Sequence, residues 1–162
     1  MFLKDKVAIV TGAGQGIGAA IAQAYAREGA KVAVVDMNAK AADDVAADIR
    51  LAGGQAKGFA CNVAERESVN QMAAAVTAEW GRVDILVNNA GITRTAMLHK
   101  MTQEQWQQVI DVHMNGSFYC LQAVVNGMIE RKSGRIINVT STAGLLGTIG
   151  QINYSAAKAA IA

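Results

Sequence analysis

Proline is absent from this sequence, and cysteine, aromatic and charged residues are all scarce. Charged residues make up only 17% of the chain and hydrophobic residues 52%, a composition unlike that of disordered proteins. Aromatic residues account for 5%, so the apolar content is mostly alanine, valine and isoleucine, which suits close packing of helices on a sheet. No repeat, low-complexity tract or linker divides the 162 residues, and this length predicts a single domain, 1–162.

Neither sign of charge dominates, and no apolar run is long. The net charge is +2, with acids and bases scattered, so no basic stripe indicates a nucleic acid or an anionic membrane as partner. No segment approaches the ~18 uninterrupted apolar residues that a membrane span needs. The N-terminus leads directly into a strand-like run without the apolar core of a signal peptide, so we expect a cytoplasmic location.

Cysteine is limited to Cys61 and Cys120, which lie far apart in the sequence. Two such residues cannot form a disulfide framework, and they have neither a CxxC arrangement nor the spacing of metal ligands. We therefore expect both thiols to pack in the core in a reducing compartment, in preference to a disulfide or a catalytic thiol. No metal site is expected.

Short apolar runs alternate with segments of helical periodicity. The apolar runs predict five strands, at 6–11, 31–36, 55–63, 83–88 and 135–139. The periodic segments predict helices from 17 to a stop at Gly29, at 41–52, at 67–80, at 103–131, and around Tyr154. Thr102, with Gln105 three residues later, has the spacing of a capping box at the start of the long helix.

The predicted strands are almost continuously apolar, which is typical of strands covered on both faces. Strand and helix alternate strictly, and crossovers between parallel strands are right-handed. The pattern therefore predicts an α/β fold of three layers around a doubly wound parallel sheet, similar to the Rossmann fold.

A glycine-rich turn follows the first predicted strand. Residues 11–18 read Thr-Gly-Ala-Gly-Gln-Gly-Ile-Gly and precede an amphipathic helix. A helix N-terminus offers free N–H groups and partial positive charge to a pyrophosphate, and glycines let the backbone approach the phosphates. A tight connection without a ligand has a similar sequence, but the position between strand and helix favours a nucleotide. The candidate cofactor-binding residues in this turn are Gly12, Gln15, Gly16, Ile17 and Gly18.

Asp36 ends the second predicted strand, at the offset where an acid meets the adenosine ribose of a bound dinucleotide. A carboxylate there accepts hydrogen bonds from the ribose hydroxyls and repels a 2′-phosphate. Because Met37 and Asn38 add no positive charge, the sequence favours NAD over NADP, with Lys40 as the one cation close by. The alternative is a solvated acid that caps the next helix.

Tyr154 and Lys158 lie four residues apart on a predicted helix and so share a face. A phenol has a reference pKa of ~10, so acid–base work near neutrality needs a neighbouring cation such as this ammonium or an oxidised nicotinamide. Ser141, after the fifth strand, is placed to donate a hydrogen bond to a substrate oxygen. Singly, these residues also fit a surface pair and a turn, but doubly wound sheets bind ligands at their strand ends.

Four motifs occur in the order and approximate spacing of the short-chain dehydrogenase/reductase family, which the chain resembles over essentially its whole length. They are the turn at 11–18, Asn88-Asn89-Ala90-Gly91, Ser141, and Tyr154-x-x-x-Lys158. The glycine pattern is similar to the compact branch, and the whole sequence is similar to 3-oxoacyl-acyl-carrier-protein reductases and related alcohol dehydrogenases. The resemblance implies hydride transfer between a nicotinamide cofactor and a carbonyl or secondary alcohol.

The resemblance also implies a role for each residue. Tyr154 would be the general acid/base and Ser141 would polarise the carbonyl, so both would touch the substrate. Lys158 would lower the pKa of Tyr154, and these two residues would also contact the cofactor at the nicotinamide ribose. Asn62 and Val63 would border the adenine. Further cofactor-lining residues would be Asn89, Ala90 and Gly91, with Asn88 bracing the sheet.

One position departs from the family pattern. Where relatives carry Val-Asn-Leu-x-Gly, residues 112–116 read Val-His-Met-Asn-Gly, so His113 replaces an Asn thought to hold a water that relays protons from the lysine. A neutral imidazole can also hold a water, which makes His113 a candidate catalytic residue and Asn115 the alternative. The competing interpretation is that His113 only packs. His99 matches nothing in the family and is expected to be solvated.

Family chains continue well beyond the active-site helix, whereas this sequence ends at Ala162. The resemblance therefore implies the front part of a longer domain, whose fifth strand becomes an apolar edge. Segment 145–151 is expected to border the substrate pocket. An acyl thioester, a steroid-like ketone and a small cyclic alcohol all remain possible substrates.

In relatives, the long helix (103–131 here) and the active-site helix commonly pack against copies of themselves, so we expect a homodimer or homotetramer. The apolar positions that serve this contact, or else face the sheet, are Val109, Val112, Leu121 and Val124. A nucleotide-binding module without turnover remains the alternative to an enzyme, although the intact Ser141, Tyr154 and Lys158 favour catalysis. A purely structural protein would need neither Asp36 nor the glycine turn.

Overall fold

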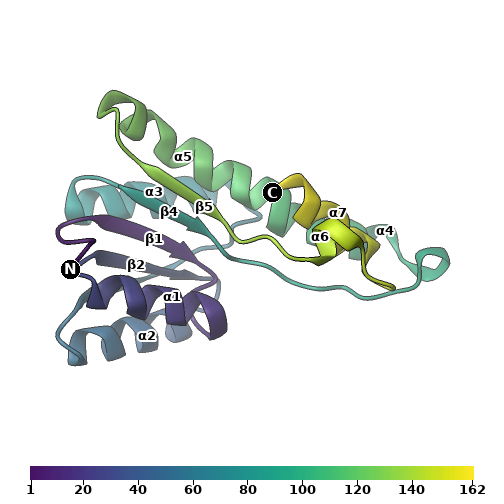
Figure 1. Ribbon diagram of the computed structural model, residues 1–162, viewed down its shortest axis with the longest axis horizontal. Helices are drawn as coiled ribbons and strands as arrows, with labels where there is room; N and C mark the ends of the chain where they lie inside the picture. Colours follow the sequence, from purple (N-terminus) through teal and green to yellow (C-terminus); the bar gives the residue numbers. More distant parts are fainter.

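The computed structural model describes residues 1–162 and contains a five-stranded sheet in which every neighbouring pair of strands is parallel (Figure 1). The strands are β1 (Val7–Thr11), β2 (Lys31–Asp36), β3 (Gln55–Ala60), β4 (Ile85–Asn88) and β5 (Arg135–Asn138). Their order in the sheet is β3-β2-β1-β4-β5. The predicted doubly wound parallel sheet is therefore confirmed, and the strand order reverses direction between β1 and β4.

Helices cover both faces of the sheet. The helices are α1 (Gly16–Arg27), α2 (Ala39–Leu51), α3 (Arg66–Trp80), α4 (Gln103–Ile110), α5 (Gly116–Glu130), α6 (Ala143–Leu146) and α7 (Ile152–Ala160), with a short 3-10 turn, η1 (Leu98–Lys100). In Figure 1, α1 and α2 lie against one face and α3 and α5 against the other. The helices α4, α6 and α7 extend beyond the carboxyl ends of the strands, at the edge where a parallel sheet binds ligands.

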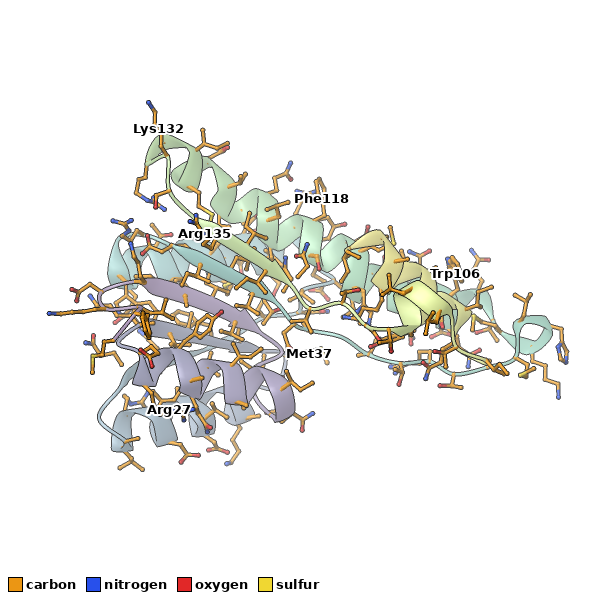
Figure 2. The ribbon with its side chains drawn as sticks, viewed as in Figure 1. Arg27, Met37, Trp106, Phe118, Lys132 and Arg135 are labelled. Carbon is orange, nitrogen blue, oxygen red and sulfur yellow. The ribbon has the colours of Figure 1, made fainter.

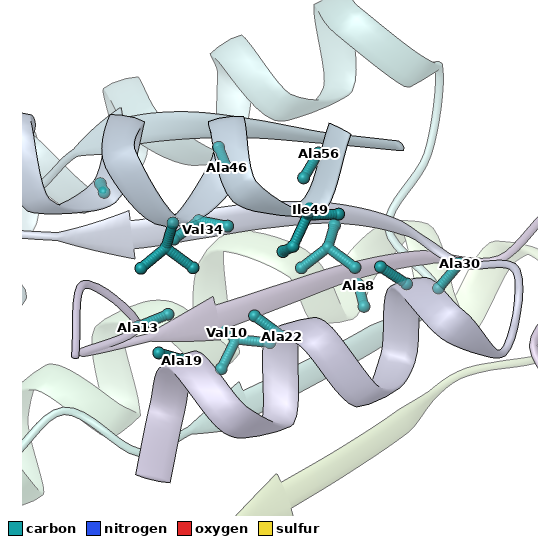
Figure 3. Close-up of a cluster of buried hydrophobic side chains, with 14 of the residues drawn as sticks. Ala8, Val10, Ala13, Ala19, Ala22, Ala30, Val34, Ala46, Ile49 and Ala56 are labelled. Carbon is teal, nitrogen blue, oxygen red and sulfur yellow. The ribbon is translucent and has the colours of Figure 1, made fainter. Parts of the chain in front are cut away.

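Alternate residues of β1 divide the core into two clusters, because successive strand side chains point to opposite faces. Ala8 and Val10 pack with α1 and α2, whereas Val7 and Ile9 pack with α3 and α5. Figure 3 shows the first cluster, in which small side chains let the helix backbones approach the sheet closely. Fully burying one valine or isoleucine side chain stabilises the folded state by roughly 1.5–3 kcal/mol. The stability of the fold therefore comes from many such side chains, each with a small contribution.

The prediction of one long helix at 103–131 is wrong in one detail. The middle of this helix, between α4 and α5, is a π-helical segment, η2 (Asp111–Asn115). The predicted capping box is present at its start, where Thr102 Oγ1 accepts from Gln105 N (3.1 Å) and Gln105 Oε1 accepts from Thr102 N (2.9 Å). A π turn holds one residue more than an α turn and changes the face that later side chains present. This wider turn contains His113, which is buried.

The expectation that every strand is covered on both faces is wrong for the two edge strands. All residues of β1 and β4 are buried, but in β3 only Ala56 is buried, and all four residues of β5 are exposed. Ile136 and Ile137 remain 40% and 41% exposed, which confirms the apolar edge predicted for the fifth strand. The third strand also ends at Ala60, earlier than predicted, so Asn62 and Val63 lie in the loop that follows it.

The remaining simple expectations concern single side chains. Cys61 and Cys120 are buried free thiols, as predicted. His99 is exposed, also as predicted. No helix combines the length and the apolar character that crossing a membrane requires.

The buried cysteines should be chemically inert in the native protein. Burial raises the pKa of the Cys61 thiol and raises that of Cys120 to about 12, so almost no reactive thiolate is present at neutral pH. We expect iodoacetamide at pH 7.5 to label neither residue in the folded protein and both in urea, as read by peptide mass spectrometry. Rapid labelling of Cys120 without denaturant would contradict its place in the core.

Candidate active site

The first βα turn brings the backbone of β1 against the backbone that follows β4. Gly12 has a φ of +62°, and a Cβ added there would lie 2.8 Å from Ala90 Cα, so only glycine fits this approach. No side chain caps the N-terminus of α1, since Gln15 at the N-cap position makes no capping hydrogen bond. The first N–H groups of α1 are thus open to an anion.

Asp36 is held at the end of β2 beside this turn. Its Oδ2 accepts a hydrogen bond from Gly14 N (3.0 Å) and its Oδ1 accepts one from Asn38 N (3.0 Å). A Cβ on Gly14 would lie 2.9 Å from Asp36 Oδ2, so the carboxylate and the glycine turn are closely packed. Lys40, the one cation near Asp36 in the sequence, pairs instead with Asp44 at 2.6 Å.

A cleft of about 430 Å³ opens at the carboxyl edge of the sheet between these elements. It is lined by ten of the predicted cofactor-binding residues: Gly12, Gln15, Ile17, Gly18, Asp36, Asn62, Val63, Asn89, Ala90 and Gly91. Four further lining residues were not among the predicted ones: Met37, Cys61, Ile92 and Val112. Met37, which is 73% exposed, projects past the end of β2 (Figure 2). Gly16 does not line the cleft, although its φ of +57° shapes the turn into α1.

Thr11 joins the two loops that form the floor of the cleft. Its Oγ1 donates to Val87 O (3.2 Å) and accepts from the backbone N–H groups of Asn89 and Ala90, both at 3.1 Å. The Asn89 side chain returns two hydrogen bonds, from Nδ2 to Thr11 O (3.0 Å) and Gly12 O (3.2 Å). Asn89 thus lines the cleft and also binds its loops together.

Two other asparagines serve mainly to hold the backbone. Asn88 is buried and its Nδ2 donates to Asn138 Oδ1 (3.0 Å) on β5, as expected of a residue that braces the sheet. Asn62 stabilises its own turn, where its Oδ1 accepts from Ala64 N (3.1 Å) and its Nδ2 donates to Glu65 Oε1 (2.8 Å). Asn62 therefore lines the cleft with a side chain that its own turn holds in place.

A second recess adjoins the cleft and contains all four predicted catalytic residues. It is lined by Ile17, Asn89, Gly91, Ile92, Thr93, Arg94, His113, Val139, Thr140, Ser141, Tyr154 and Lys158. The first four of these also line the cleft. The two cavities therefore share a wall and form one continuous site.

Lys158 is only 4% exposed and lies below Tyr154 on α7. Its Nζ donates to Val139 O (2.5 Å) and lies 5.7 Å from the centroid of the Tyr154 ring. Burial lowers the pKa of the Lys158 ammonium. Thr140 Oγ1 donates to Lys158 O (2.7 Å), which anchors the helix to the end of β5.

Ser141 lines the same recess, just after β5. Its Oγ accepts a hydrogen bond from Ala143 N (3.2 Å), so the hydroxyl proton is free to be donated to a ligand. The predicted trio of Ser141, Tyr154 and Lys158 is therefore brought together, although its members come from two different segments.

His113 lies under the recess, only 1% exposed. Its Nε2 lies 3.0 Å from Ile92 N and 2.9 Å from Ile92 O, and its ring meets the Tyr154 ring edge-on at 5.3 Å. A Cβ at Gly91 would overlap the imidazole, so the histidine occupies space that the glycine leaves. Burial, with the nearby Lys158 charge in a smaller part, lowers the His113 pKa and favours the neutral ring.

The alternative candidate, Asn115, points elsewhere. Its Nδ2 donates to Asp111 Oδ1 (2.7 Å) within η2, and it lines neither cavity. Of the two residues considered for the proton relay, His113 alone lies in the recess. The Nδ1 atom of His113 is buried and has no hydrogen-bond partner in the protein.

One expectation about a neighbouring surface was wrong, and of the two orientations considered for the apolar positions of the long helix the inward one is observed. Segment 145–151 does not line the recess; five of its residues instead line a separate groove with residues 96–98. In the long helix, Val109 and Val124 are 0% and 6% exposed and pack inward. The exposed aromatic residues of this helix are Trp106 and Phe118, which project outward (Figure 2). Loop paths and the π turn decide these positions, and neither could be predicted from hydrophobic periodicity.

The structural roles of two buried polar residues in the site, Thr11 and Asn153, were not predicted from the sequence. Thr11 was seen only as part of a motif, and its signal was a hydroxyl residue at the end of a buried strand. Asn153 was not considered; it is 0% exposed and immediately precedes Tyr154. The only sign of its role in the sequence is an asparagine between the apolar Ile152 and Tyr154.

Comparison with known proteins agrees with this geometry. A family model described as short chain dehydrogenase matches residues 6–162. The chain is 49% identical to a 3-oxoacyl-(acyl-carrier-protein) reductase of Synechocystis over 98% of its length, and 44% identical to a D-threitol dehydrogenase of Mycolicibacterium smegmatis over 96%. A 3-oxoacyl-(acyl-carrier-protein) reductase of Vibrio cholerae is 45% identical over 99% of the chain. The chain spans 65%, 60% and 65% of these relatives, respectively.

Removing the Thr11 hydroxyl should loosen the junction of β1 and β4. The Thr11→Val variant keeps the shape but leaves two backbone N–H groups without an acceptor, which costs about 1–3 kcal/mol of stability. We expect the urea midpoint of unfolding to be lower than in the wild type. Thr77→Val is the matched control, because Thr77 Oγ1 only donates to Ala73 O (2.9 Å) within α3. Equal effects of the two substitutions would contradict the special role of Thr11.

Proposed function

This chain belongs to the short-chain dehydrogenase family, and on that premise we propose that it transfers hydride between a nicotinamide dinucleotide and a carbonyl or secondary alcohol. The observation that carries the proposal is the shared wall of the two cavities. Ile17, Asn89, Gly91 and Ile92 line both the cleft beside the glycine turn and the recess beside Tyr154. A dinucleotide held in the first cavity would reach the reacting groups in the second.

The residues of the cleft fit a dinucleotide. The uncapped N-terminus of α1 offers N–H groups to the pyrophosphate, and the absence of a Cβ at Gly12 and Gly18 lets the turn pack closely against Ala90 and against its own backbone. Val63 and Asn62 would border the adenine. Asn89, Ala90, Gly91 and Lys158 would hold the nicotinamide end, whose ring supplies or accepts the hydride when the cofactor is bound.

Tyr154 is the proposed general acid/base. In the reductive direction its hydroxyl gives a proton to the substrate oxygen, and in the oxidative direction the phenolate takes one. The Ser141 hydroxyl donates a hydrogen bond to the same oxygen, where negative charge develops. The Lys158 ammonium donates one of its three N–H groups to Val139 O. The other two N–H groups remain for hydrogen bonds to the cofactor ribose and for returning a proton toward Tyr154.

We assign His113 to the last step of this proton path. Its neutral ring is held by the Ile92 backbone, and its unpartnered Nδ1 is suited to a buried water between the imidazole and solvent. The ring also supports Tyr154 by its edge-on contact. This role needs the neutral form, which burial favours.

NAD is the proposed cofactor in preference to NADP. Each Asp36 oxygen accepts only one hydrogen bond from the backbone, so both retain capacity for the ribose hydroxyls. A 2′-phosphate would meet the same carboxylate, and the one cation close by in the sequence, Lys40, lies 2.6 Å from Asp44 in an exposed ion pair.

Neutralising Asp36 should relax this preference. We expect the Asp36→Asn variant to narrow the ratio of NADH to NADPH affinity by about tenfold, equivalent to ~1.4 kcal/mol. Fluorescence titration with both nucleotides measures it, and Asp48→Asn on the exposed side of α2 controls for the loss of one charge. A wild-type preference for NADPH would refute the assignment to NAD.

The competing proposal is a nucleotide-binding module without turnover. Substitution of Tyr154 distinguishes it from an enzyme. We expect Tyr154→Phe in the full native polypeptide to bind NADH normally but to lose roughly 10²–10⁴-fold in turnover. Tyr119→Phe is the control, because Tyr119 lies on α5 outside both cavities. Nicotinamide-coupled assays over a panel of ketones, alcohols and acyl thioesters provide the readout, and undiminished turnover by Tyr154→Phe would exclude the mechanism.

The substrate and the assembly are proposed at a coarser level. Two of the relatives are named for 3-oxoacyl groups on acyl carrier protein, so an acyl thioester with a ketone is the first substrate class to test, ahead of a free polyol. We also propose a homodimer or homotetramer. The exposed Trp106 and Phe118 supply an apolar outer face on the long helix for this contact.

A further inference from the structure

Asn153 is a completely buried polar residue in the first turn of α7. Its Nδ2 donates to Arg94 O and to Gln105 O, both at 3.0 Å. Its Oδ1 accepts from Tyr154 N at 2.8 Å. One side chain thus connects α7, α4 and the segment that follows β4, with both amide protons and the carbonyl oxygen satisfied.

The segment after β4 forms the wall between the two cavities. Gly91 and Ile92 line both of them, and Arg94 lines the recess. This segment has no regular secondary structure, so its position depends on side chains that bind its backbone. Three buried side chains do so, with Thr11 at Asn89 and Ala90, His113 at Ile92 and Asn153 at Arg94, and the last two hold the part of the segment nearest Tyr154.

The same two side chains contact Tyr154 from different directions. His113 packs edge-on against its ring, and Asn153 accepts the hydrogen bond of its backbone N–H. That N–H lies in the first turn of α7, where no intrahelical acceptor exists, and Gln151 at the N-cap makes no side-chain hydrogen bond. Asn153 therefore satisfies a group that the helix leaves unpaired.

We propose that Asn153 is a positioning residue for the reaction, an inference that rests on the proposed function. By holding Arg94 O and Tyr154 N at once, it sets the distance between the wall that faces the nicotinamide and the hydroxyl that handles the proton. A misplacement of about 1 Å between reacting groups can cost on the order of 10²-fold in rate.

The geometry selects asparagine among similar residues. Aspartate has the same shape but would turn a carboxylate toward two carbonyl oxygens, leaving both without a donor. Serine has one hydroxyl proton and can serve only one of the two carbonyls. Alanine has no proton for either carbonyl. We therefore expect a smaller loss of kcat with serine than with alanine.

The test compares Asn153→Ala and Asn153→Ser with the wild type in the full native polypeptide. Asn126→Ala is the matched control, because Asn126 is exposed on α5 and makes no hydrogen bond through its side chain. We expect Asn153→Ala to lower kcat about 10- to 100-fold while the KM for NADH changes less than about twofold. Asn153→Ser should recover part of kcat, and thermal unfolding shows that each variant is folded at the assay temperature.

The outcomes separate this inference from the proposed function. A wild-type kcat in Asn153→Ala, with Tyr154→Phe inactive, overturns the role of Asn153 alone. A fall in kcat matched by an equal rise in the KM for NADH makes Asn153 merely structural and also overturns it. If Asn153→Ala does not fold, Asn153→Ser decides by the same criteria. Absence of turnover by the wild type over the whole substrate panel overturns both proposals, because no reaction then remains to be positioned.

Discussion

The hydrogen bonds of the Thr11 hydroxyl join the carboxyl ends of β1 and β4, and the rest of the site depends on this junction. A parallel sheet with the order β3-β2-β1-β4-β5 separates its connections at that point, so a crevice opens between the loops. Thr11 and Asn89 bind the loops across the crevice through backbone groups that would otherwise be unpaired. The glycine turn can then approach Ala90 closely without closing the cavity.

Burial controls the chemistry at the other end of the site. Lys158 and His113 are both nearly inaccessible, and burial lowers the pKa of each. Both retain a backbone partner, Val139 O for the lysine and the Ile92 backbone for the histidine. A polar group buried with a partner is rigid, while the same group without one costs free energy. These backbone partners thus hold the two buried side chains in place at the lining of the recess.

The part of the molecule beyond the sheet is held differently from the part around it. The sheet and its helices are held by two apolar clusters. The helices beyond the sheet, α4, α6 and α7, bury only a few apolar side chains, such as Val109 and Ala157. This arm, which carries Tyr154, is also attached through polar contacts, from Thr140 to the Lys158 carbonyl and from Asn153 to Arg94 and Gln105. Hydrogen bonds are directional where apolar contacts are not, so this arm gains its precision from few interactions. The exposed isoleucines of β5 lie next to it, in a chain that spans 60–65% of its relatives' length.

The sequence by itself determined the alternation of strands and helices, the glycine turn, Asp36 and the Tyr154–Lys158 pair. These features are encoded locally, in apolar periodicity, in residues that only a turn accepts, and in the helical spacing of four. Only the tertiary structure showed that His113 lines the recess and Asn115 does not, because their positions depend on a π turn and on the space left by Gly91. It also revealed Thr11 and Asn153, whose partners include backbone groups 48 to 79 residues away. Backbone N–H and C=O groups are the same at every residue, so no sequence pattern marks which of them a buried side chain will bind.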